Sequence, residues 1–216
     1  MQKQSIINNH KKFENNIEEI LQYGAEIILD LSSKGRIPEK EKGLLLESLI
    51  LRVCALWEKF LEEELILAVK LDCSMLKEKM NLPKRINLDN SVIRAILFSD
   101  NYRDFHELDK VNGLFKKYTV EQYNPFVKKI SSKQKDSIQF VYKIRNYLSH
   151  YSGFAKRVLS KEYERKYKLN RFQEPGKFLI ANNGKRFKEL ISDFKYVSII
   201  MRQIFKGNKD VGYIQI

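Results

Sequence analysis

Glycine and proline are scarce in this chain, and their scarcity restricts the fold. The 216 residues include nine Gly and four Pro, whereas β-sandwiches and barrels need frequent turns that draw on these residues. Long apolar runs are also lacking, because charged side chains interrupt the most apolar region, 44–69, several times. The first residues hold no run that suits a signal peptide. We therefore expect a helical protein with no membrane partner.

Cysteine and histidine are equally rare. The chain has two cysteines, Cys54 and Cys73, three histidines and no CxxC motif, so neither a disulfide framework nor a zinc site is indicated. We expect free thiols in a reducing compartment, which favours a cytoplasmic location, and we expect no cofactor or metal.

Acidic residues become few in the second half of the chain. Residues 1–108 carry 16 Lys and Arg against 18 Asp and Glu, whereas residues 109–216 carry 24 against 9. The whole net charge of +13 therefore arises in the second half. Such an excess favours a polyanionic partner, although a generally Lys-rich composition would give the same count. Charge alone does not choose between nucleic acid and an acidic membrane surface.

Apolar residues recur at helical spacing along most of the chain, which predicts an all-α protein. We expect a single domain over 1–216: a bundle of four to six helices with its core at about 40–205 and an N-terminal helical segment at about 9–34. A short irregular or extended segment is expected near 172–184, where Pro-Gly and Asn-Asn-Gly are typical of turns. The expected helices cover about 9–31, 38–71, 89–98 with Asp89 as its cap, 104–118 and 132–148, a continued or separate segment at 154–171, and 185–205.

One expected helix of the basic half combines an arginine with a histidine. It buries an apolar stripe and leaves four polar residues facing outward: Arg145, Asn146, Ser149 and His150. Arginine can hold a phosphate through two N–H groups, and histidine can donate or accept a proton near neutral pH. Because the RNA 2′-hydroxyl is a nucleophile already attached to its phosphate, such a pair suits RNA cleavage without a metal. About 0.15 such Arg-x4-His pairs are expected by chance, so the placement of the pair matters more than its occurrence.

The spacing of this pair has a geometric consequence. On a regular helix Arg145 and His150 lie about 140° apart. They can reach one phosphate if the helix ends or loosens near 148–151, or if a second copy of the helix completes the site. The helix at 38–71 carries apolar residues on more than one side, which leaves surface for a partner subunit.

The run Arg145-Asn-Tyr-Leu-Ser-His150 resembles the Arg-Asn-x-x-x-His motif of the HEPN superfamily. The segments 52–61 and 105–118 are similar to two helices of its ribonuclease-like branch, so the resemblance covers about 40–205. It implies a small helical bundle that forms a homodimer and acts as a metal-independent endoribonuclease, often as a toxin or phage-defence effector with an antitoxin or defence-system partner. Arg145 and His150 would then be catalytic, and Asn146 would orient the site.

The resemblance also suggests supporting residues and shows one departure. Glu58, in a Trp-Glu pair, is taken as a supporting polar residue together with Ser149 and Tyr151. Family members modified by a partner nucleotidyltransferase carry Tyr two positions after the histidine. Here that position is Ser152, which argues against restraint by that route.

Basic residues continue beyond the motif. The side chains expected to contact RNA phosphates are Lys143, Lys156, Arg157, Lys161 and Arg165, with Tyr163, Tyr167 and Phe172 between them for base stacking. A solvated helix face would show the same pattern. His106, near a helix start, is interpreted as structural.

The sequence thus predicts a homodimeric endoribonuclease that acts on RNA. Two other classes fit the same features. One is a non-catalytic helical module that binds RNA or a nucleotide in a salt-sensitive way, and the other is a helical interaction subunit in which Arg145 and His150 are structural.

Overall fold

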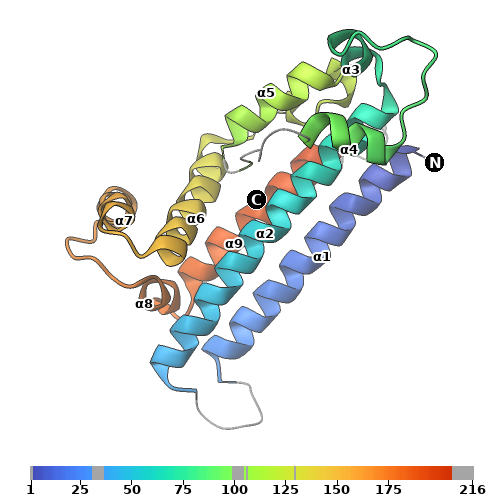
Figure 1. The fold of residues 1–216 in the computed structure, drawn as a ribbon. Helices are drawn as coiled ribbons and strands as arrows, with labels where there is room; N and C mark the ends of the chain where they lie inside the picture. Colours follow the sequence, from blue (N-terminus) through green and yellow to red (C-terminus); the bar gives the residue numbers. More distant parts are fainter. Residues whose placement is uncertain (1, 31–36, 99–104, 106, 129, 206–216) are drawn as a thin grey trace. The chain divides into compact units, whose positions relative to one another are not determined.

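The computed structural model describes residues 2–30, 37–98, 105, 107–128 and 130–205. The expected helix end at Leu31, the expected helix start at Asp104, and His106 lie outside them. Every regular element in the described residues is helical, which confirms the all-α prediction (Figure 1). The elements are α1 (Gln2–Ile28), α2 (Glu39–Leu71), α3 (Ser74–Lys79), α4 (Asn90–Phe98), α5 (Leu108–Tyr118), the 3₁₀ turns η1 (Glu121–Tyr123) and η2 (Pro125–Val127), α6 (Ser132–His150), α7 (Gly153–Tyr167), α8 (Pro175–Ile180) and α9 (Lys185–Arg202).

The described residues contain more helices than the four to six expected. Of the nine α-helices found there, α3 and α8 were not expected; each has only six residues, too few to produce a clear helical period in the sequence. The segment after α6 forms a separate helix, α7, rather than a continuation.

The prediction of extended backbone near 172–184 is wrong for the centre of that segment. Residues 172–174 are irregular, but α8 begins directly afterwards at Pro175. Proline suits the first turn of a helix, because its missing N–H would have no intrahelical partner there. Phe178 and Leu179 are buried, and this burial stabilises so short a helix. The second expected turn is present at 181–184.

The chain forms two compact units. The first takes its residues from 1–14, 57–131 and 196–216, and the second takes 15–56 and 132–195. Helices α1, α2 and α9 each contribute to both units. The expectation of a single domain over 1–216 stays a prediction.

Aromatic packing and a buried histidine mark the interior of the first unit. Trp57 and Phe60 of α2 pack on Phe13 of α1, and the rings of Phe13 and Phe60 stack with centroids 4.6 Å apart. His10 is completely buried. Its Nδ1 lies 2.9 Å from Oγ of Ser198, and its Nε2 lies 3.0 Å from Oε1 of Glu64.

The polar contacts of His10 belong to a longer network in the same unit. Ser198 donates to Oε1 of Glu14 at 3.1 Å, and Arg202 pairs with the other oxygen of Glu14 at 3.0 Å. Asn9 donates to Oε2 of Glu64 at 3.1 Å. Buried charges and polar groups cost free energy unless they are paired. The network therefore holds α1, α2 and α9 in one arrangement within this unit.

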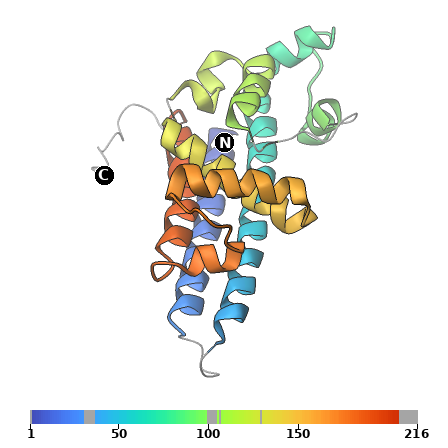
Figure 2. The same cartoon turned by 90° about the vertical axis from the view of Figure 1, so that its left-hand side faces the viewer.

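Aromatic rings also fill the interior of the second unit. Phe140 of α6, Tyr163 of α7 and Phe178 of α8 contact one another, and the closest ring centroids, those of Tyr163 and Phe178, are 4.5 Å apart. The stripe expected on α6 is confirmed, because Phe140, Val141, Ile144 and Leu148 are all buried. Helix α7 turns sharply away from α6 (Figures 1 and 2).

Two glycines allow α2 and α8 to approach closely in this unit. A methyl group added at Gly176 would lie 2.6 Å from the Cα of Gly43, closer than real atoms pack. We expect Gly176→Ala to lower the free energy of unfolding by about 1–3 kcal/mol, the usual cost of overpacking. In the control Gly113→Ala, nothing lies within 4 Å of the added methyl group, and stabilisation by about 0.5–1 kcal/mol is expected. Thermal unfolding measures both changes, and an unaltered midpoint for Gly176→Ala would contradict the close approach.

Candidate active site

The two predicted catalytic residues lie in the last two turns of α6. Arg145 is half-buried, and its Nη1 donates to Oδ1 of Asn146 at 3.2 Å. His150 is the final residue of the helix and is exposed, as is Ser149. Because the helix stays regular through His150, the two side chains leave it about 140° apart. The end of α6 therefore does not by itself direct both at one phosphate.

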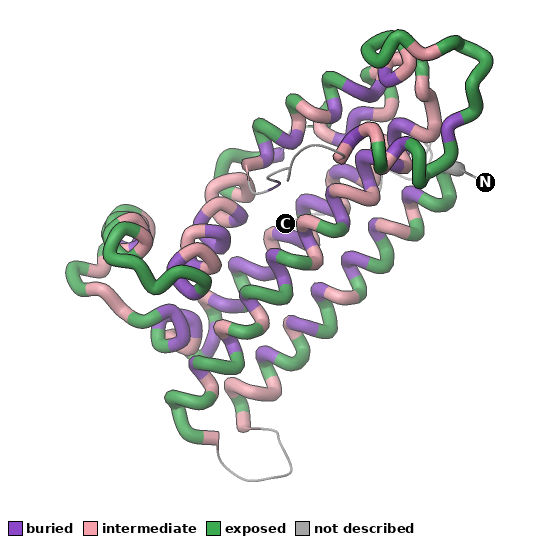
Figure 3. Tube along the Cα trace, viewed as in Figure 1, coloured by how far each residue is buried: buried purple, intermediate pink, exposed green. Residues whose placement is uncertain are grey.

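A tight turn directly after His150 exposes aromatic side chains. Tyr151 adopts a left-handed conformation with φ of 45°, and its N–H donates to the carbonyl of Tyr147 at 2.8 Å. Ser152 then caps α7 by accepting from the N–H of Ala155 at 3.1 Å. Tyr151 and Phe154 are 64% and 71% exposed, which leaves two rings free to stack beside His150. The turn that joins α6 to α7 is coloured as exposed in Figure 3.

Two of the predicted RNA-binding cations are held by acids between α6 and α7. Lys143 pairs with Glu162 at 2.7 Å, and Arg165 pairs with both Glu162 and Asp136 at 2.8 Å. Burial opposes ionisation of Glu162, but hydrogen bonds from Lys143 and Arg165 outweigh it and lower its pKa. The pKa of Asp136 is lowered in the same way, by Lys166 and Arg165 acting against burial. Lys143 and Arg165 therefore primarily join α6 to α7.

The other predicted cations lie on the open face of α7. Lys156, Arg157 and Lys161 are exposed, and Nζ of Lys156 lies 4.6 Å from the ring centroid of Phe172. The expectation that Tyr163 stacks on bases is wrong, because its side chain is completely buried among the rings of the second unit. Burial of Tyr163 between α6 and α8 leaves the cations on the solvent side.

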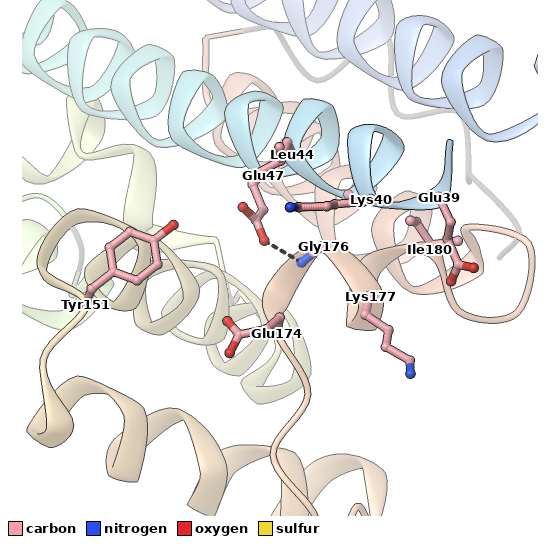
Figure 4. A pocket seen from close by; sticks show the side chains of 10 residues that line it. Glu39, Lys40, Leu44, Glu47, Tyr151, Glu174, Gly176, Lys177 and Ile180 are labelled. Atoms are coloured by element: carbon pink, nitrogen blue, oxygen red, sulfur yellow. Dashed lines mark hydrogen bonds between the residues drawn. The ribbon is translucent and has the colours of Figure 1, made fainter. Parts of the chain in front are cut away.

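A pocket of about 510 Å³ begins at Tyr151, the residue after His150. Figure 4 shows the carboxylates of Glu47 and Glu174 pointing into the space between Tyr151 and Gly176. Lys177 points away from that space. The lining residues are Glu39, Lys40, Gly43, Leu44, Glu47, Tyr151, Glu174, Gly176, Lys177 and Ile180. The candidate catalytic helix end thus borders a pocket with acceptor groups.

Tyr147 links this pocket to α6. Its hydroxyl donates to Oε2 of Glu174 at 3.0 Å, and its ring lies 5.3 Å from that of Tyr151. Burial, together with the hydrogen bond to Glu174, raises the pKa of Tyr147 to about 12. The phenol therefore stays protonated at neutral pH and keeps the carboxylate of Glu174 in place.

Glu47 holds the start of α8. Its Oε1 accepts from the N–H of Gly176 at 2.7 Å. Burial, reinforced by the negative charge of Glu174 and opposed by the Gly176 hydrogen bond, raises the pKa of Glu47 above its ordinary value of 4.5. An acid with a raised pKa in the folded state favours folding when protonated, and this contribution is lost as the pH rises through the raised value.

We therefore expect Glu47→Gln to be more stable than the wild type at pH 7, because glutamine keeps an acceptor for Gly176 without the buried charge. The difference should shrink as the pH falls through the raised pKa of Glu47 toward 4.5, the ordinary pKa of a glutamate, and should be lost below it, where Glu47 is protonated in both the folded and the unfolded chain. Unfolding midpoints across this pH range measure the effect. A variant less stable than the wild type at pH 7 would contradict it.

Glu58 and His10 lie in the first unit. Glu58 is half-buried on α2, and its role as a supporting residue stays a prediction. His10, which sequence reasoning left without a role, contacts a serine and a glutamate in the order of a catalytic triad. Ser198 donates its proton to Glu14 rather than to His10, however. His10 and Ser198 are also completely buried. This network is structural.

Sequence analysis also missed Glu47, Tyr147 and Glu174. Glu47 offered a signal, since it interrupts an otherwise apolar stretch of α2. Glu174 follows a basic segment and precedes a Pro-Gly pair, and no periodic pattern marks it. Only the approach of α8 to α2 and α6 places these residues around one pocket.

Two kinds of feature are absent from the described residues. No group of three His, Cys, Asp or Glu side chains there is arranged to hold a metal ion. In the same part of the chain, no helix has the combined length and apolar character that crossing a bilayer requires.

Comparison with known proteins provides no further guide to this site. No protein-family model matches the chain, and neither the curated proteins nor the solved structures contain a significant match.

Proposed function

We propose that this protein is a metal-independent endoribonuclease whose catalytic residues are Arg145 and His150. One observation carries the proposal. An arginine and an exposed histidine lie in the last two turns of one helix, followed directly by exposed rings and by the open basic face of α7. A basic surface with accessible aromatic side chains is the usual means of holding a single nucleic-acid strand.

The proposed chemistry uses the RNA as its own nucleophile. His150 removes the proton of a 2′-hydroxyl, which attacks the adjacent phosphate, and the 5′-oxygen of the next nucleotide leaves and takes a proton from water. Arg145, held by Asn146, stabilises the negative charge that develops on the phosphate oxygens. The exposed cations of α7 bind the neighbouring phosphates. The products are a 2′,3′-cyclic phosphate and a 5′-hydroxyl end.

A second copy of the chain is part of the proposal. Because Arg145 and His150 leave a regular helix about 140° apart, the arginine of one copy would act with the histidine of the other. Exposed apolar side chains on α2 that do not line the pocket beside Tyr151 would be covered in such a homodimer: Leu45 and Leu51. We place this enzyme in the cytoplasm, where RNA is available.

The test is cleavage of a labelled RNA by the purified chain in the presence of EDTA. We expect products with 2′,3′-cyclic phosphate ends, identified by mass spectrometry, and no cleavage of the same sequence made with 2′-deoxynucleotides. Intact RNA would contradict the proposal. Salt-sensitive binding without cleavage would favour a non-catalytic RNA-binding module instead.

A further inference from the structure

We propose that the pocket beside α6 binds a guanine base, with the carboxylate of Glu174 accepting two of its N–H groups and the ring of Tyr151 stacking on its face. As a subsite for RNA, the guanine pocket rests on the proposed ribonuclease activity, because the pocket would determine the base next to which the RNA is cut. Binding of a free guanine nucleotide depends only on the pocket.

Glu174 is held in place but can accept further hydrogen bonds. Its Oε2 accepts from the Tyr147 hydroxyl, and each carboxylate oxygen can accept two hydrogen bonds. Both oxygens of Glu174 therefore retain acceptor capacity on the side that faces the pocket (Figure 4). Glu47, in contrast, already binds the N–H of Gly176. Glu174 is thus an oriented carboxylate able to receive a pair of donors.

Two adjacent acceptors on one carboxylate match guanine among the four RNA bases. On its Watson–Crick edge guanine presents two adjacent donors, N1–H and the 2-amino group, which fit the two oxygens of one carboxylate. The corresponding edges of adenine and cytosine place a ring-nitrogen acceptor beside the amino group, and in uracil two carbonyl oxygens flank the single N–H. A carboxylate is repelled by each of these acceptors. Single-stranded RNA exposes this edge for recognition.

Acidic side chains in the pocket are separated from the basic side chains of α7. The pocket carries Glu39, Glu47 and Glu174 against Lys40 and Lys177, so it disfavours a phosphate. The exposed cations of α7, which favour phosphates, follow the same turn that presents Tyr151. This division suits a nucleotide whose base enters the pocket while its phosphate stays outside.

The pocket has an aromatic side chain in its wall and room for one base. Tyr151 lines it and is largely exposed, and base stacking on an aromatic side chain contributes about 1–3 kcal/mol in measured systems. The volume of about 510 Å³ lies within the range of small-molecule sites. The ring, the carboxylate and the space are therefore all present for one base.

The first experiment measures binding of GMP, IMP, AMP, CMP and UMP to the full chain by calorimetry. We expect GMP to bind about 10- to 100-fold more tightly than AMP, CMP or UMP, the discrimination typical of a two-bond base contact. IMP, which lacks the 2-amino group, should fall between them. Equal affinities for all five would overturn the proposal.

Variants locate the site. Glu174→Gln should remove the preference for GMP, because its amide presents a donor where guanine also presents one. The matched control Glu189→Gln changes the same charge at an exposed position on α9 that does not line the pocket, and it should keep the preference. Tyr151→Asn removes the ring while tolerating the left-handed backbone, and it should weaken all five nucleotides. Unaltered GMP binding by a folded Glu174→Gln chain, as checked by thermal unfolding, would overturn the proposal.

Cleavage mapping separates the two proposals. Preferred cutting next to guanine that is lost in Glu174→Gln supports both of them. Cutting without base preference leaves the ribonuclease standing and contradicts the guanine site. Selective GMP binding by a chain that leaves RNA intact contradicts the ribonuclease and retains the site.

Discussion

Alanine at His150 is expected to lower the rate of RNA cleavage by about 10²- to 10⁴-fold, the usual contribution of a general acid or base. Arg145→Ala should lower the rate by about 10²- to 10³-fold, because it removes the donors that stabilise the developing phosphate charge. The matched control is Lys188→Ala, an exposed cation of α9 in the same unit, and it should retain the wild-type rate. Rates measured on one labelled RNA at saturating enzyme compare the three variants.

Mixing the two inactive variants tests whether one site draws on two copies. A mixed dimer of Arg145→Ala and His150→Ala holds an intact arginine on one copy and an intact histidine on the other. If these residues act together, an equimolar mixture should recover roughly one quarter of the wild-type rate, since half of the dimers are mixed and each has one intact site of two. Absence of recovery would contradict the shared site. Wild-type rates in the single variants would contradict the whole mechanism.

Alanine at Glu64 is expected to lower the free energy of unfolding by about 2–6 kcal/mol, because leaving a buried donor without an acceptor costs about 1–3 kcal/mol and two donors lose theirs. The carboxylate receives hydrogen bonds from His10 and Asn9, and its removal leaves both donors without that acceptor inside the protein. Single-residue losses of this size are rare and arise from such buried networks.

Urea unfolding followed by tryptophan fluorescence measures this change where it occurs. The single tryptophan, Trp57, lies in the same unit as Glu64. Glu78→Ala is the control, because Glu78 is an exposed glutamate of that unit, and its replacement should alter the free energy by less than about 0.5 kcal/mol. A Glu64→Ala chain within that limit would show that the network does not stabilise the unit.

Local features of the fold were predictable from the sequence because neighbouring residues determine them. Asp89 caps α4 as expected, since its Oδ1 accepts from the N–H of Val92 at 2.9 Å. The bounds of α2 and the start of α6 at Ser132 agree with the prediction to within a residue. Helix α8 was missed because only six residues and the burial of Phe178 and Leu179 define it. Burial of that kind depends on partners distant in the chain.

In the candidate site, too, some features depend on neighbouring residues and others on contacts between distant ones. The sequence determined that Arg145 and His150 share one helix in a basic region, because helical periodicity and charge are properties of consecutive residues. Tertiary structure decided which groups are available around them. It paired Lys143 and Arg165 with acids, buried Tyr163, and brought Glu174 and Glu47 to one pocket beside Tyr151. Those outcomes depend on the packing of α2, α6, α7 and α8. A contact such as that of Glu47 with Gly176 joins residues more than a hundred positions apart and leaves no local pattern in the sequence.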